Sequence, residues 1–98
     1  MSTPQQRVRE ITRALLDQLA SDEPLGAEAI ELRAQLAEAT AEAGRLEDAY
    51  YQVEELLKDA QRHHGPDHEA VTRSRAAVEA VREIGMRAVG MGDSAAQG

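Results

Sequence analysis

The sequence predicts an all-α fold of four antiparallel helices, and three observations lead to this prediction. Apolar residues recur at intervals of three and four along most of the 98 residues, which is the spacing of amphipathic helices. No stretch alternates polar and apolar residues at period two, as a half-buried strand would. Proline and glycine interrupt the helical pattern at three places, namely Pro24, Gly44 and the pair Gly65–Pro66. Three tight links between four helices follow from this pattern.

The first two helices are bounded by residues with clear capping preferences. The first is predicted over residues 5–20, where Pro4 suits the first turn and Thr3 suits the N-cap position. The second is predicted from Leu25 to Ala43. Gly44 is well placed to end it, because glycine adopts a left-handed backbone conformation at little cost.

The third and fourth helices are predicted over residues 46–63 and 67–88. Pro66 and Asp67 are expected to start the fourth helix, because the exposed amides and the helix dipole favour an acid there. Residues 90–98 contain small residues without a helical period, so they are predicted to form a flexible tail behind a single domain, residues 1–89.

Each helix carries an apolar stripe that is predicted to face the core. The stripes consist of Val8, Ile11, Leu15, Leu16 and Leu19 in the first helix, Leu25, Ala29, Leu32, Leu36, Ala39 and Ala43 in the second, Leu46, Ala49, Tyr50, Val53, Leu56, Leu57 and Ala60 in the third, and Val71, Val78, Val81, Ile84 and Met86 in the fourth. Of the neighbours Tyr50 and Tyr51, one is expected to pack between helices and the other to reach solvent or a partner.

Composition excludes several classes of protein. The chain has no cysteine, so a disulfide framework is excluded and an intracellular, cytoplasmic location is expected. No apolar run is long enough to span a membrane, and no signal-peptide core follows Met1. The net charge of −7 argues against nucleic acid as the main partner, because phosphate binding needs a clustered positive face.

An internal repeat of 42 residues gives the predicted helices an architecture. Shifting the sequence by this length places Ile11 on Val53, Leu15 on Leu57, Pro24 on Pro66, Arg33 on Arg75, Ala34 on Ala76 and Leu36 on Val78. The repeated unit is a helix, a turn that contains proline, and a second helix. Such units bury their apolar faces by stacking on neighbours.

The segment from Leu32 to Arg75 resembles a tetratricopeptide repeat of the 42-residue type found in actinobacterial and kinesin-light-chain-like arrays. Leu36 and Ala37 resemble the family's leucine-plus-small pair, residues 42–45 read EAGR, Ala49 resembles the mid-helix alanine, and residues 65–68 read GPDH. The resemblance implies two stacked helical hairpins, in which the first helix is the second half of a preceding repeat and the fourth is the first half of a following one.

The resemblance also implies a non-enzymatic interaction module that binds a protein or peptide through its second and fourth helices. The residues expected to contact this partner are Arg33, Glu38, Glu42, Tyr51, Arg75 and Arg82. The family members that bind chaperone tails clamp a terminal carboxylate with Lys and Asn. This chain has no Asn, and its single Lys58 lies on the other helix type, so that specialised role is rejected.

Charge is concentrated in the middle of the chain. Residues 22–59 contain eleven acids and three bases, a charge of −8, whereas residues 1–21 carry +1 and residues 60–98 carry 0. Such a run is usually a solvated face. The sharper alternative is a docking surface for a basic partner, with Glu38 and Glu42 facing the groove.

The thin apolar core bears on the oligomeric state. The 18 alanines dominate the 42% of hydrophobic residues, so the monomer should be marginally stable. We therefore expect a homodimer, or a complex with another protein that completes the stack. The rival functions are a small acidic helical homodimer with a structural or scaffold role, and an antitoxin-like acidic inhibitor of a basic protein.

Catalysis, cofactors and metals are not expected. His63, His64 and His68 have a spacing that could present imidazoles to zinc, but the glycine and proline between them favour a turn and a helix N-terminus. Neither a nucleophile–base pair nor a glycine-rich phosphate loop after a strand is found in the sequence.

Overall fold

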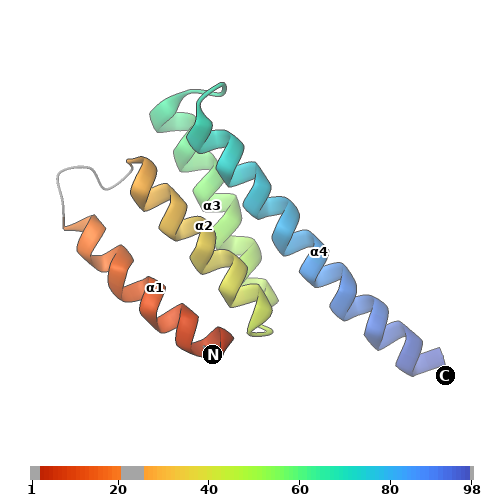
Figure 1. Cartoon of the computed structure of the whole chain (residues 1–98). Coiled ribbons are helices and arrows are strands. Elements are labelled where there is room, and N and C mark those ends of the chain that lie inside the picture. The colour runs from red at the N-terminus through yellow and green to blue at the C-terminus, as the bar shows by residue number, and fades with distance from the viewer. Residues whose placement is uncertain (1–2, 21–25, 98) are drawn as a thin grey trace.

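The computed structural model describes the backbone of residues 3–20 and 26–97, and the side chains of this backbone except those of Leu19 and residues 90–97. These residues form the helices α1 (Pro4–Leu19), α2 (Ala27–Glu42), α3 (Leu46–His64) and α4 (Glu69–Gln97). No strand occurs among them, which confirms the all-α prediction. Figure 1 shows successive helices running in alternate directions, with α1 and α4 at opposite edges.

The helix ends follow the capping chemistry of the sequence. Thr3 caps α1 in a capping box, in which its side chain accepts from the Gln6 amide and the Gln6 side chain accepts from the Thr3 amide. Gly44, after α2, and Gly65, after α3, have φ angles of 89° and 88°. Both glycines therefore sit where a side chain would be strained, and the predicted ends of these helices are confirmed.

The bounds of α4 differ from the prediction at both ends. The helix begins at Glu69 and not at Asp67, because the His68 ring takes the capping role: its Nδ1 accepts a hydrogen bond of 3.0 Å from the Ala70 amide. At the other end α4 continues to Gln97, past the predicted end near Ala88. No proline follows Ala88, and glycine lowers helix propensity without forbidding the helix. The break predicted around Pro24 lies outside the described residues.

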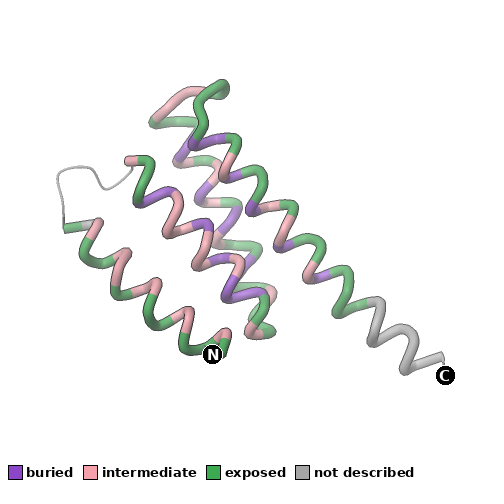
Figure 2. The backbone as a smooth tube through the Cα atoms, viewed as in Figure 1, coloured by how far each residue is buried: buried purple, intermediate pink, exposed green. Residues whose placement is uncertain are grey.

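Helix α2 is the centre of the fold. It packs against α1, α3 and α4, whereas α1 packs against α2 alone among the four helices. Its buried residues therefore lie on several sides, and they are Ala29, Ile30, Ala34, Ala37, Ala39, Thr40 and Ala41. The predicted stripe included Ala29 and Ala39 but missed the others, because a single stripe describes a helix with one buried face. Figure 2 shows this burial along α2 and along the facing sides of α3 and α4.

Alanine supplies nine of the fourteen buried apolar residues in the described part of the chain. Ile30, Val53, Leu56, Val71 and Val81 are its largest fully buried apolar residues. Leu16 and Met86, both predicted to face inward, are exposed, because α1 has one neighbour and Met86 lies on the side of α4 away from α2 and α3.

The two tyrosines lie in different environments on α3. The Tyr50 ring lies against Gly85 of α4, where an added Cβ would overlap the Tyr50 hydroxyl. Tyr51 is 67% exposed. Tyr50 thus contacts α4 and Tyr51 reaches solvent, but Tyr50 is itself 42% exposed and not buried as the predicted stripe of this helix had it. No helix in the described part of the chain is both long and apolar enough to cross a membrane.

Candidate functional site

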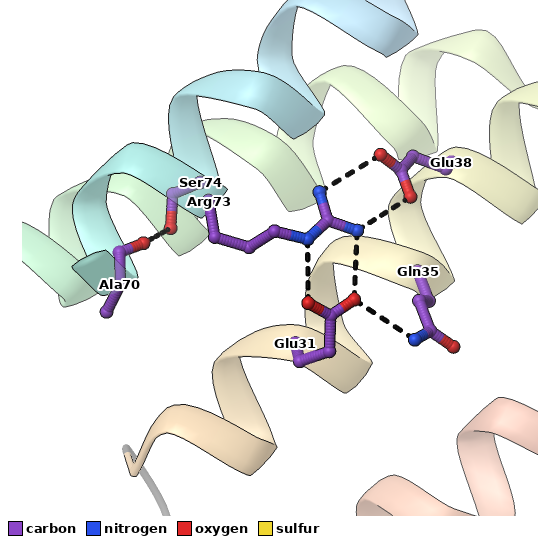
Figure 3. A network of polar contacts seen from close by, with 6 residues as sticks. All are labelled: Glu31, Gln35, Glu38, Ala70, Arg73 and Ser74. Carbon is purple, nitrogen blue, oxygen red and sulfur yellow. Dashed lines mark hydrogen bonds and ion pairs between the residues drawn. The ribbon is translucent and has the colours of Figure 1, made fainter.

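A cluster of charged side chains joins α2 to α4 (Figure 3). Arg73 donates through Nε and Nη2 to both carboxylate oxygens of Glu31, at 2.9 and 3.0 Å. It also donates through Nη1 and Nη2 to both oxygens of Glu38, at 3.2 and 3.0 Å. Gln35 donates a further hydrogen bond to Glu31 at 3.0 Å. One guanidinium therefore holds two carboxylates of the neighbouring helix in bidentate geometry, which is the geometry of strong charge-assisted hydrogen bonds.

The charges of this cluster stabilise one another. The hydrogen bonds from Arg73 hold the pKa of the Glu31 carboxyl below its usual value, against the opposing effect of burial. The hydrogen bonds from Glu31 and Glu38 raise the pKa of the Arg73 guanidinium further. A carboxylate with a lowered pKa stays ionised at neutral pH and is a poor general acid. The cluster is therefore built to hold helices together.

Other ion pairs tie the acidic hairpin α2–α3 to its surroundings. Arg7 of α1 pairs with Glu42 of α2 at 3.1 Å. Arg33 of α2 pairs with Asp59 of α3 at 3.0 Å, and both side chains are partly buried. The bases of the end helices and of the hairpin itself thus neutralise much of the central acidity that the sequence displays.

The residues predicted to bind a partner are not brought together on one surface. Arg33 and Glu38 are engaged inside the fold, with Asp59 and Arg73. The remaining four are more exposed: Glu42 pairs with Arg7, Arg82 pairs with Glu79 on its own helix, and Tyr51 and Arg75 form no ion pair or hydrogen bond with described residues.

An open groove of about 760 Å³ is lined by the starts of α1 and α3, the end of α2 and the second half of α4. Its wall is mostly apolar and includes Pro4, Ala41, Leu46, Ile84 and Ala88. Two charged residues line it, Glu42 and Arg87. Glu42 is already paired with Arg7, whereas Arg87 has no carboxylate partner among the described residues.

Sequence reasoning found only Glu42 of this groove. Residues of all four helices line it, so no stretch of sequence contains the groove as a pattern. Arg73 and Glu31 were missed as well, although a signal existed: they lie 42 residues apart, at equivalent positions of the repeat, and carry opposite charges.

The histidines form a small stack at the turn between α3 and α4. The His64 ring lies 4.6 Å from that of His63 and 4.3 Å from that of His68. Among the side chains that the structure describes, no group of three or more His, Cys, Asp or Glu is arranged to hold a metal ion. The clearest role in this stack is that of His68 as the cap of α4.

Comparisons with known proteins add no assignment. No protein-family model, no curated protein and no solved structure matches this chain.

Proposed function

We propose that this chain is a non-enzymatic protein-interaction module, similar to tetratricopeptide repeats, that holds a segment of a partner protein in the groove lined by residues of all four helices. The observation that carries the proposal is the groove itself, which combines an apolar wall with a guanidinium, that of Arg87, for which the described residues offer no carboxylate partner. Apolar concave sites with a few placed polar groups are the usual binding sites of proteins.

The charges in the groove indicate the chemistry of the segment. Glu42 is neutralised by Arg7, so the groove offers little to a cluster of basic residues. Arg87 can form a bidentate pair with a carboxylate. The segment that fits best therefore has apolar side chains, which lie on Ile84 and Leu46, and an acidic residue that pairs with Arg87.

A displayed library of random peptides tests this proposal with the full chain. Peptides selected on the wild type should be apolar and acidic, and they should lose affinity for the variants Arg87→Glu and Ile84→Asp when binding is measured by fluorescence anisotropy. Arg87 is exposed, so the first variant changes charge without disturbing the core.

Val89→Asp is the matched control, because Val89 is exposed on α4 and does not line the groove. Circular dichroism verifies that each variant keeps its helices. Peptides that bind Arg87→Glu and Ile84→Asp as well as the wild type would contradict the proposal, and so would a library that yields no binding peptide.

A further inference from the structure

The helices at the two edges of the molecule each keep a free face. Helix α1 packs against α2 and against no other described helix. Helix α4 packs against α2 and α3, and its opposite side carries the exposed residues Arg75, Glu79, Arg82 and Met86. In Figure 1, α4 continues straight past the turn between α2 and α3 and does not fold back on itself. Within the described chain, nothing therefore covers this side.

The internal repeat indicates which helix would cover the free side of α4. A shift of 42 residues carries α1 onto α3 and α2 onto α4. The packing agrees, because α1 lies on α2 as α3 lies on α4. Apart from their contact with each other, α2 packs against two helices, α1 and α3, whereas α4 packs against one, α3, the equivalent of α1. On α4, no helix of the described chain lies at the place that α3 takes on α2. The helix equivalent to α3 under the 42-residue shift is α1.

An ion pair between α2 and α3 indicates which residues would meet if α1 of another copy packed on α4. Arg33 of α2 pairs with Asp59 of α3 at 3.0 Å. The equivalent residues after the shift are Arg75 on α4 and Asp17 on α1. Both are exposed, and neither forms an ion pair with a described residue. Within one chain they lie on different edge helices, so they can form the same pair only between two copies.

A second pair falls in the same register. Seven residues, or two helical turns, after Arg75 on α4 stands Arg82, and seven residues before Asp17 on α1 stands Glu10. Because α3 runs back along α2 (Figure 1), an equivalent α1 would run back along α4 and set Glu10 beside Arg82. Among the described residues, Arg82 pairs only with Glu79 of its own helix, at the surface. The free face of α4 thus carries two bases where that of α1 carries two acids.

We propose that copies of this chain associate head to tail, with α1 of one copy on the free face of α4 of the next, so that Arg75 pairs with Asp17 and Arg82 with Glu10. This contact is heterologous, so it builds an open row or a closed ring and not a two-fold dimer. It is independent of the peptide groove, which lies on a different side of α4.

The same comparison predicts how strong the association is. Ile30 and Ala37 are buried in α2, whereas their equivalents on α4 are Thr72 and Glu79, both exposed. The contact between copies therefore depends more on charge and less on apolar burial than the contacts within the chain. Association through exposed charges weakens as salt is added.

Charge reversal in two separate chains tests the proposal. Arg75→Asp and Asp17→Arg should each abolish self-association, measured by sedimentation velocity of the full chain at low ionic strength, because like charges then meet at every contact. A mixture of the two variants should associate again, because Asp at position 75 of one variant meets Arg at position 17 of the other, and the remaining wild-type ends match as well.

The controls are charge reversals elsewhere on the surface. Arg62→Asp and Glu54→Arg change the net charge by the same amounts at exposed positions of α3, and each should associate as the wild type does. A wild type that stays monomeric at high concentration and low salt would overturn the proposal. So would single variants that still associate, or a mixture of the two that does not.

Discussion

Replacing Arg73 by methionine tests the electrostatic link between α2 and α4. The substitution keeps much of the side-chain volume, removes four hydrogen bonds and leaves Glu31 and Glu38 facing each other without a counter-charge. Arg73 is 27% exposed, Glu38 22% and Glu31 44%, so the contacts lie between buried and surface pairs. Buried charged hydrogen bonds contribute about 1.5–3 kcal/mol and exposed ion pairs about 0.2–1 kcal/mol. With about 1 kcal/mol for each carboxylate, we expect a loss of about 2 kcal/mol.

Urea unfolding followed by circular dichroism measures this loss. A change of this size lowers the Tm of a domain of this length by about 8–16 °C. Lys58→Met is the control, because Lys58 and Glu55 form an exposed pair at 3.8 Å within one helix, and its effect should stay below about 0.5 kcal/mol. Converting Glu31 and Glu38 to glutamine in the Arg73→Met background should recover part of the loss. Equal effects of Arg73→Met and Lys58→Met would refute the reasoning.

Three other perturbations have definite expected outcomes. Folding lowers the pKa of Glu31, so the unfolded chain binds more protons than the folded chain below the ordinary glutamate value of 4.5, and the free energy of unfolding decreases as the pH is lowered through that window. Glu31→Gln should make this decrease shallower, and parallel pH profiles of variant and wild type would contradict the reasoning. Gly44→Ala should cost about 1–2 kcal/mol in urea unfolding, because φ is +89° although the site is open; an unchanged midpoint would show that the turn adapts. Gly85→Ala should destabilise the wild type, where Tyr50 occupies the space, and should stabilise a Tyr50→Ala variant by about 1 kcal/mol through helix propensity; a double-mutant cycle without coupling would disprove the contact.

Local chemistry made the helices predictable from the sequence, and three-dimensional packing decided the rest. Thr3 and Gly44 act within a few residues of themselves, so the ends they define could be read directly. The burial of Ala34 and Ala37 could not, because these residues lie outside the one stripe that periodicity gave α2 and are buried because α2 packs against three helices. The pairing of surface charges was least predictable, since Glu38 is an ordinary acid in the sequence and forms an ion pair with Arg73 only because α4 lies beside α2.

The internal repeat also explains why its two halves differ in charge at some positions and agree at others. Glu31 and Arg73 are equivalent positions that touch each other, so identical residues there would place like charges side by side and drive α2 and α4 apart. Arg33 and Arg75 are equivalent positions that do not need to differ, because the partner of Arg33 is Asp59, on a helix of the other type. At these two positions, charge is reversed where the equivalent helices α2 and α4 touch, and it is kept where the residue pairs with a helix of the other type. If Arg75 pairs as Arg33 does, its partner is an acid at the position equivalent to Asp59, which in this chain is Asp17.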